Sequence, residues 1–471
     1  MRTLVLASTL VVSALGSGHS QSRATAGQRD WVSVDAPVVA LAHVQVVDGT
    51  GAAPAVDQTI IITGDRITSV GPAASVRIPA GATVLDLTGH TVIPGIVGLH
   101  DHTNYTTSVR VVQLNLSAPR LYLASGVTTI RTTGGISPYG EINLKRSIER
   151  GMMPGPRMYI TGPHLTGEPV IRGMHQLLTQ EAARRTVDYW AEEGASWLKF
   201  YTTPSREVMG AAIDQAHKRG LKVTGHLCSI GFREAVQLGI DNLEHGLFVN
   251  TEYDPDKQPD QCPAGARAKL ATLDLNSPAV QATFREMIGK KVAMTSTLAV
   301  YEAMVPNRPP LDPRVLEAMS GETRAEYLTS RVRLTEEGAF AVTPEIFRKA
   351  QDYELAFVRA GGLLAAGVDP TGNGGALPGF GDQRNYELLI EAGFTPVEAI
   401  QIMTLNGARL LGADSLYGSL APGKLADLVV IKGDPVKQPG AIRNVVTVFK
   451  DGLGYDSMKL IQSVRGQVGI R

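Results

Sequence analysis

Cysteine is scarce in this chain of 471 residues, and so are aromatic side chains and unbalanced charge. The two cysteines, Cys228 and Cys262, are too few for a disulfide framework or an all-cysteine zinc site, and whether they form a single bridge stays open. The 45 Lys and Arg residues cancel the 45 Asp and Glu residues. This balance excludes a partner held by bulk electrostatics, such as nucleic acid or an anionic membrane.

A membrane-spanning run is also missing, although the N-terminus is apolar. Arg2 precedes an apolar stretch from Leu4 to Leu15, and small residues follow it. This order is typical of a secretory signal, and the stretch is too short to span a bilayer. We therefore predict that residues 1–22 are a signal peptide. The mature protein is expected in the periplasm or secreted, without a stable membrane span.

The composition is rich in glycine (50 residues) and 43% hydrophobic, which favours an α/β protein with many tight turns. Short β-branched runs with Asp-Gly and Gly-Asp turns occupy residues 38–94 and 416–455. We predict that these two ends form one small composite β-sandwich domain. Two insertions, at 251–276 and 301–341, are candidates for a lid over the site.

Between these ends, residues 95–415 alternate short apolar strands with amphipathic helices. Helices are expected at 181–194 and at 204–220, the latter with Thr203 as N-cap, and Thr395 opens a capping box. The alternation predicts a (β/α)8 TIM barrel, with a doubly wound sheet as the alternative that lacks a glycine fingerprint here. The predicted strands are Ile96–His102, Val127–Thr132, Arg157–Gly162, Trp197–Tyr201, Lys222–His226, Asn242–His245, Val292–Thr295 and Leu363–Asp369.

Ionisable residues gather near the C-terminal ends of these strands, where barrel enzymes keep their active sites. His100 and His102 are two apart on one strand, so both imidazoles point the same way and form half of a divalent-metal site. A buried amine at Lys199 is costly when charged, but sensible if it is neutral and carbamylated by carbon dioxide. Taken alone, Lys199 is better explained as a strand-end lysine that reaches solvent, and only the joint occurrence of five such strand ends favours a site. The other members of the set are His226, His245 and Asp369.

The segment from Val92 to His102 resembles the first-strand signature of the amidohydrolase superfamily. Gly126–Arg131 and Gly418–Val429 resemble later motifs of its branch of metal-dependent Xaa-Pro dipeptidases, imidazolonepropionase-like proteins and ochratoxin-type amidases. The resemblance covers roughly residues 38–455. Two departures are Gly98, where relatives usually carry an Asp, and Thr132, which replaces an acid.

The resemblance implies a two-metal centre. One ion would be bound by His100 and His102, and the second by His226 and His245. Carbamylated Lys199 would bridge both ions, and Asp369 would contact the metal and the attacking water. The ligand types accept Zn, Mn, Co or Fe, and we predict Zn.

The function that follows is cleavage of amide C–N bonds in dipeptides or N-acyl amino acids by metal-bound hydroxide, with Asp369 as the proton shuttle. The Tyr201 phenol is a candidate for contacting the carbonyl oxygen, and His164 and His175 are candidates for contacting substrate. The alternatives are hydrolysis of a cyclic amide, lactone or phosphotriester on the same centre, and a non-catalytic ligand-binding barrel. Lys199 disfavours a mononuclear imidazolonepropionase or a deaminase. Assembly into a homo-oligomer stays open.

Overall fold

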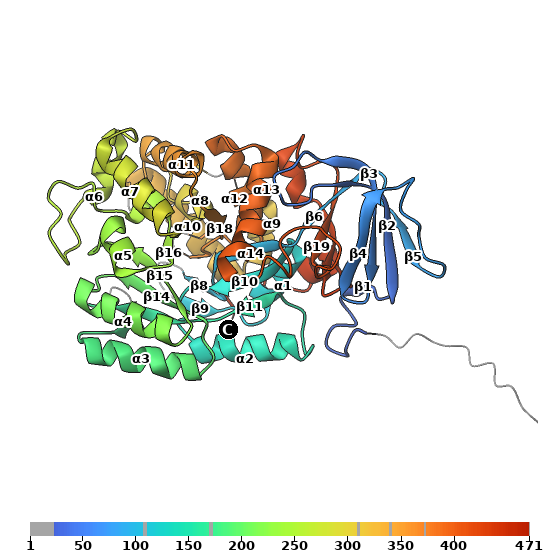
Figure 1. Cartoon of the computed structure of the whole chain (residues 1–471), viewed down its shortest axis with the longest axis horizontal. Coiled ribbons are helices and arrows are strands. Elements are labelled where there is room, and N and C mark those ends of the chain that lie inside the picture. Colours follow the sequence, from blue (N-terminus) through green and yellow to red (C-terminus); the bar gives the residue numbers. More distant parts are fainter. Residues whose placement is uncertain are drawn as a thin grey trace, which may run out of the picture.

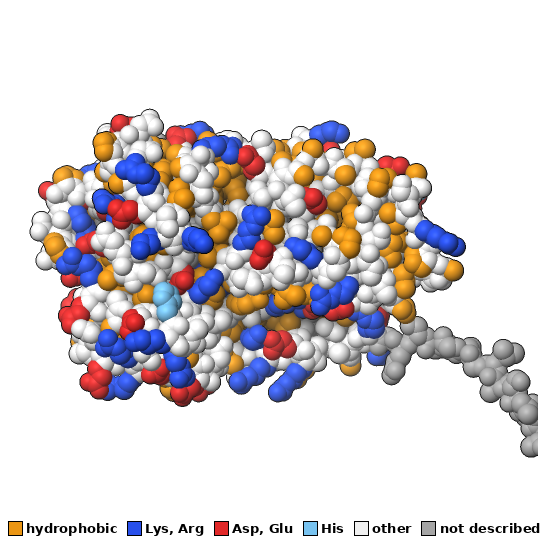
Figure 2. Space-filling model, in the orientation of Figure 1, with side chains coloured by type: hydrophobic (Ala, Val, Ile, Leu, Met, Phe, Trp, Pro, Cys, Tyr) orange, Lys and Arg blue, Asp and Glu red, His pale blue; other side chains and the backbone are white. Residues whose placement is uncertain are grey.

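The structure is a computed structural model, which describes residues 23–106, 111–168, 173–308, 311–338, 342–371 and 374–470 (Figure 1). The predicted signal peptide, residues 1–22, lies outside the described residues. Within the described part of the chain, no helix combines the length and apolarity needed to cross a bilayer. On the face drawn in Figure 2, basic and acidic side chains are interspersed, in keeping with the balanced charge of the sequence.

One mixed sheet is built from both ends of the chain and lies beside the barrel, at the right of Figure 1. Strand β19 pairs antiparallel with β6, so that Leu428 lies opposite Pro94 and Lys432 opposite His90. The two chain ends therefore share one sheet, while the exact domain boundaries stay a prediction. Its strands, in spatial order, are β1 (Val32–Val34), β21 (Leu453–Asp456), β20 (Val445–Lys450), β19 (Leu428–Lys432), β6 (His90–Pro94), β2 (Val38–Val46), β3 (Ala55–Thr63) and β4 (Arg66–Pro72), with β5 (Thr83–Asp86) paired to β2.

The barrel strands are parallel and follow one another in chain order, which confirms the predicted fold class. The third position is made of two pieces, because the strand breaks at Ile160. The last strand closes on the first, where the Asp369 amide donates to the His100 carbonyl oxygen at 2.8 Å. The strands are β7 (Ile96–Asp101), β10 (Val127–Thr132), β11 (Arg157–Tyr159), β12 (Thr161–Thr166), β14 (Trp197–Thr202), β15 (Lys222–Leu227), β16 (Asn242–Glu244), β17 (Ala293–Ser296) and β18 (Leu364–Ala366).

Amphipathic helices cover the outside of the barrel. In α3, the residues that face the barrel are Ala183, Val187 and Trp190, as the 3.6-residue period predicts. The helices outside the connecting insertions are α1 (Ser117–Ala124), α2 (Pro138–Glu149), α3 (Gln180–Glu192), α4 (Arg206–Lys218), α5 (Phe232–Leu238), α7 (Pro278–Gly289), α11 (Pro344–Arg359), α12 (Phe380–Ala392), α13 (Pro396–Met403), α14 (Leu405–Leu411) and α15 (Ser457–Gln462).

The remaining elements lie in the connections, and the 301–341 insertion is largely helical rather than an irregular loop. It holds the end of α8, then α9 and α10, whose caps Asp312 and Ser320 each accept a backbone N–H. These elements are β8 (Asn104–Thr106), β9 (Val111–Gln113), β13 (His175–Gln176), α6 (Ala266–Lys269), α8 (Leu298–Glu302), α9 (Pro313–Ala318), α10 (Gly321–Glu337) and the 3-10 turns Gly246–Val249, Leu270–Thr272 and Pro439–Arg443.

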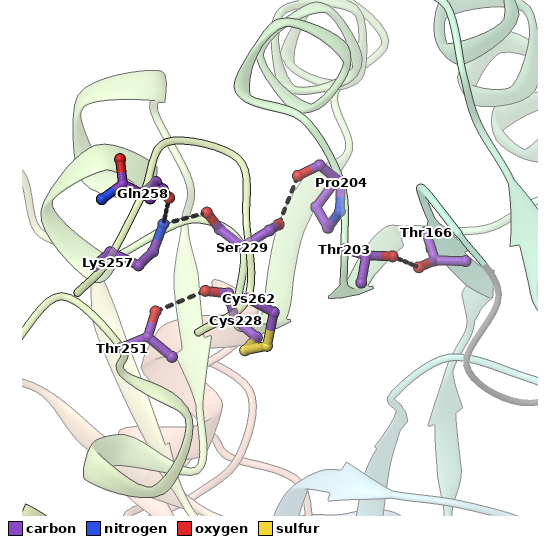
Figure 3. Close-up of a disulfide and its surroundings, with 9 residues drawn as sticks. All are labelled: Thr166, Thr203, Pro204, Cys228, Ser229, Thr251, Lys257, Gln258 and Cys262. Carbon is purple, nitrogen blue, oxygen red and sulfur yellow. Dashed lines mark hydrogen bonds between the residues drawn. A yellow bond between two sulfur atoms is a disulfide. The ribbon is translucent and has the colours of Figure 1, made fainter. Parts of the chain in front are cut away.

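Two helix starts test the capping predictions. The capping box of Thr395 with Glu398 is present at the start of α13 and confirms that prediction. The N-cap predicted for α4 at Thr203 is wrong: the helix begins later, and Ser205 accepts the N–H of Val208. Thr203 instead hydrogen-bonds the Thr166 hydroxyl at 2.9 Å (Figure 3), so its side chain is already engaged with the neighbouring strand end.

Candidate metal centre

The six predicted metal ligands lie at the C-terminal side of the barrel strands. His100 is in β7 and His102 follows its end, while Lys199 and His226 project from the neighbouring strands β14 and β15. His245 directly follows β16, and Asp369 lies just beyond β18. The C-terminal ends of parallel strands meet at one rim, which explains why residues so far apart in sequence converge.

The centre of the cluster is the imidazole of His100. Its Nε2 lies 3.0 Å from Lys199 Nζ and 3.7 Å from the Asp369 carboxylate. His102 Nε2 lies 3.3 Å from the same carboxylate. Ligand atoms of His100, His245 and Asp369 all fall within 4.8 Å of one another, the geometry expected of groups around a metal ion. The Lys199 amine is buried and points into this cluster rather than into solvent.

Each of three histidines is held through its Nδ1. His100 Nδ1 lies 2.7 Å from Glu244, His102 Nδ1 donates to the Gly134 carbonyl oxygen at 3.1 Å, and His245 Nδ1 lies 2.7 Å from the Thr297 hydroxyl. A bond at Nδ1 fixes the ring so that Nε2 keeps its lone pair for a metal. His245 Nε2 is buried and, among the described residues, has no hydrogen-bond partner. The donor set therefore fits a divalent cation.

A row of rings continues the cluster across the barrel rim. The His226 ring is 4.4 Å from the His245 ring and 4.6 Å from the Tyr201 ring. His164 then lies 5.6 Å from Tyr201 and 5.8 Å from His102. The structure thus brings His226, Tyr201 and His164 to the predicted site.

His175 does not join this group. It is exposed on β13, and its Nε2 lies 3.3 Å from the hydroxyl of Thr186 on α3. The expected substrate contact is therefore unsupported for His175. His175 does pair with Leu165 at the C-terminal end of β12, but its side chain is exposed and contacts α3 instead of the cluster.

Backbone conformation also marks the site. His245 and Asp369 both have positive φ angles, 65° and 49°, a region that non-glycine residues rarely adopt. Such strain persists only where the surroundings impose it, and it gathers at functional positions. Nearby, Gly367 lets β18 approach β7, since a Cβ there would overlap the backbone of His100.

Burial sets the charge state of the cluster. Burial lowers the pKa of Lys199 to about 8 and that of His100 to about 4. The pKa values of His226 and His245 are also lowered by burial, so these three rings are neutral at pH 7, as metal ligands must be. Burial alone would raise the pKa of Asp369, but His100 and His102 hold it well below its ordinary value, so the carboxylate stays ionised.

A buried ion pair behind His100 was missed by the sequence reasoning. Arg131 Nη2 donates to Glu244 Oε1 at 2.5 Å, and both side chains are fully buried. The Arg131 guanidinium also stacks over Trp197 at 4.4 Å. The sequence feature that could have indicated this pair is Arg131 itself, an arginine at the end of an apolar strand.

The structure also explains why a glycine can occupy position 98, where relatives usually carry an Asp. The Asp101 carboxylate fills the space beside Gly98, where a Cβ would overlap it. Asp101 Oδ1 accepts the Val368 amide at 3.1 Å and so ties the first barrel strand to the last. An acid thus supports this strand end from a different sequence position.

Comparisons with known proteins agree with this arrangement. The Amidohydrolase family model matches residues 380–453. A putative prolidase from Bifidobacterium longum is similar over 91% of this chain and 98% of its own, with 25% identity and a TM-score of 0.64. A Xaa-Pro dipeptidase with bound methionine is similar over 89% of this chain and 100% of its own, with 20% identity and a TM-score of 0.68.

Local sequence matches involve further proteins. Adenine deaminase 1 from Desulfotalea psychrophila is 48% identical over 42 residues, which is 9% of this chain and 7% of that protein. This chain therefore matches less than a tenth of that curated relative's length. The local family match, the fold of the prolidase-like structures and the strand-end cluster agree: the chain is similar to proteins of the amidohydrolase superfamily.

Proposed function

We propose that the protein is an exported binuclear metal-dependent hydrolase that cleaves amide C–N bonds of dipeptides or N-acyl amino acids. The observation that carries the proposal is the buried convergence of Lys199, His100 and Asp369 beside the unpartnered Nε2 of His245. The amidohydrolase match and the prolidase-like neighbours support a hydrolase that acts on C–N bonds.

The residues fit two cations, which we expect to be Zn. His100, His102 and Asp369 would hold one, His226 and His245 the other, and Lys199 would reach both as a carbamate. The neutral amine that carbamylation requires is available, because burial lowers the pKa of Lys199 to about 8. When bound, two divalent cations lower the pKa of a shared water and polarise the scissile carbonyl.

The protein's own groups perform the proton transfers and the positioning. Ionised Asp369 is placed to accept a proton from the attacking water and to return it to the leaving nitrogen, which must be protonated to depart. Burial raises the pKa of Tyr201 to about 12, so its phenol stays protonated at neutral pH. It can then donate a hydrogen bond to the oxygen on which negative charge develops.

Export is supported by two features of the chain. The leader-like N-terminus is one. The other is a disulfide between the chain's two cysteines, Cys228 and Cys262, with a Cα–Cα distance of 5.0 Å. Such bonds persist mainly in oxidising compartments.

The test combines metal analysis with a substrate panel. The protein reconstituted with Zn and bicarbonate should hold two ions per chain and hydrolyse dipeptides or N-acyl amino acids faster than lactones, phosphotriesters or adenine. Asp369→Asn should lower kcat by about 100-fold or more, because general acid–base catalysis contributes this much. Asp214→Asn, which changes a surface pair with Lys218, is the matched control. A single ion per chain, or full activity in Asp369→Asn, would contradict the proposal.

A further inference from the structure

An arginine stands beside the metal centre without an acidic partner. Arg267 lies on α6, within the segment that connects β16 to α7. Its guanidinium carbon is 5.7 Å from the centre of the Tyr301 ring, and that ring is 5.5 Å from the His245 ring, edge to face. One aromatic side chain therefore separates this cation from a predicted metal ligand.

Two other cations in or beside this segment, Lys269 and Arg206, have acidic partners. Lys269 Nζ lies 2.6 Å from Asp254 and 2.6 Å from Asp256, and Arg206 on α4 binds Asp260 at 3.0 Å. Within the described residues, the half-buried side chain of Arg267 has neither a salt bridge nor a hydrogen bond. A partly desolvated cation that lacks a protein anion is arranged to receive one from elsewhere.

The positive charge of Arg267 also acts electrostatically on two tyrosines of the site. Burial, the larger effect, raises the pKa of Tyr201, whereas the charge of Arg267 acts in the opposite direction. Arg267 likewise acts on the phenol of Tyr301. The cation is therefore close to both tyrosines that flank the histidine rings.

The segment that carries Arg267 is fastened to the strand end that carries His226 (Figure 3). The disulfide joins Cys262, five residues before Arg267, to Cys228, two residues after His226. The Thr251 hydroxyl donates to the Cys228 carbonyl oxygen at 2.6 Å. Lys257 Nζ donates to the Ser229 carbonyl oxygen, also at 2.6 Å. The arginine is thus held in place before any ligand binds, which lowers the ordering cost of binding.

We propose that Arg267 binds the free carboxylate of the substrate's leaving amino acid, and that the Cys228–Cys262 disulfide positions it. This inference rests on the proposed amide hydrolysis. In a dipeptide or an N-acyl amino acid, the α-carboxylate lies only two bonds from the leaving nitrogen, so its receptor must stand close to the metals. A guanidinium binds a carboxylate through paired, charge-assisted hydrogen bonds. Substrates with a neutral group at this position lose that contact.

The test uses two substrates with the same scissile bond, glycyl-leucine and glycyl-leucinamide. Wild-type enzyme should prefer the acid in kcat/KM by about 100-fold, the scale of a charged hydrogen-bonded contact. Arg267→Met should lose about 100-fold on the acid and change less than about twofold on the amide, whereas Arg267→Lys should keep part of the preference. Arg285→Met removes an exposed cation on α7 and should leave both values unchanged.

The positioning role of the disulfide has its own readout. Cys262→Ser should raise KM for the acid several-fold while the KM for the amide and the metal content stay constant, because only the arginine is loosened. An equal change for both substrates would indicate a merely structural bond.

Failure of the two proposals can be told apart. If loaded wild-type enzyme hydrolyses both substrates equally well, the role of Arg267 is overturned and the hydrolase stands. If it hydrolyses neither, the proposed function fails, and calorimetric binding to Asp369→Asn still measures the carboxylate contact. Equal affinity of that variant for acid and amide, or no loss of acid binding when Arg267→Met is added, would overturn the inference.

Discussion

Glu244 shows how a single buried residue can organise a metal site without binding the metal. One carboxylate oxygen lies 2.7 Å from His100 Nδ1, while the other accepts from Arg131 and, at 2.9 Å, from Asn242. Burial alone would raise the pKa of Glu244, but Arg131 and then His100 hold it far below its ordinary value. The carboxylate is therefore always ionised and fixes the orientation of His100.

Glu244→Gln should weaken metal binding while leaving all six ligands present. An amide orients His100 less firmly, so we expect the metal affinity to fall about 10- to 100-fold. Competition against a chelator measures this affinity. The control is Glu286→Gln on α7, which changes a partly exposed pair with Arg233 on α5. Unchanged affinity in a correctly folded Glu244→Gln protein would show that the residue serves Arg131 alone.

Lys199 gives the reconstitution of the metal-free enzyme a distinct pH dependence. Carbon dioxide reacts with the neutral amine, which predominates above the pKa. With a pKa of about 8, the neutral fraction is about one-tenth at pH 7, half at pH 8 and nine-tenths at pH 9. At fixed dissolved carbon dioxide, metal uptake should speed up about fivefold from pH 7 to 8 and less than twofold from 8 to 9.

The rate of metal uptake can be followed with a metal-sensitive dye. His100 and His245 do not change their protonation state between pH 7 and 9, because burial lowers the pKa of His100 to about 4 and the pKa of His245 is also well below its ordinary value. A tenfold rise per pH unit through pH 9 would instead indicate an ordinary, exposed lysine amine.

At the scale of elements, the barrel strands could be predicted from sequence because each is a short apolar run that ends in a polar residue. Predicted strand 222–226 corresponds to β15 at Lys222–Leu227, and 242–245 to β16 at Asn242–Glu244. The topology rule for parallel barrels then gathers the strand ends, so the convergence of the six residues followed from strand positions, whereas their role as metal ligands is a prediction from the resemblance to the amidohydrolase superfamily.

What the sequence could not predict depends on contacts between distant elements. The predicted start of α4 was wrong because the Thr203 side chain hydrogen-bonds to Thr166, at the end of the neighbouring strand β12. The Arg131–Glu244 pair joins β10 to β16, and neither strand's pattern reveals its partner. Arg267 is placed by a loop and a disulfide rather than by any periodic element, so only the structure shows where its charge lies.

At the scale of the whole molecule, one arginine couples the barrel to the composite sheet. Arg157 of β11 binds Asp427 at 2.7 Å and Asp451 at 2.6 Å, both in the C-terminal part of the sheet domain. Its guanidinium also lies over the Tyr417 ring at 4.9 Å. The Asp427 side chain is 1% exposed, so Arg157 is the cation that pairs with a buried carboxylate.

Arg157→Met should destabilise the molecule by about 3 kcal/mol, because it leaves the Asp427 carboxylate buried and unpaired. Scanning calorimetry should show a lower apparent melting temperature, with full metal content retained at low temperature since the metal cluster lies at the other strand ends. Adding Asp427→Asn should recover part of the loss: the amide is neutral, and its oxygen can still accept the Asp451 N–H that Asp427 accepts at 2.8 Å. If the double variant is less stable than Arg157→Met, then the buried charge is not the source of the lost stability. Packing of the arginine against Tyr417 would then contribute more to the contact between the barrel and the composite sheet.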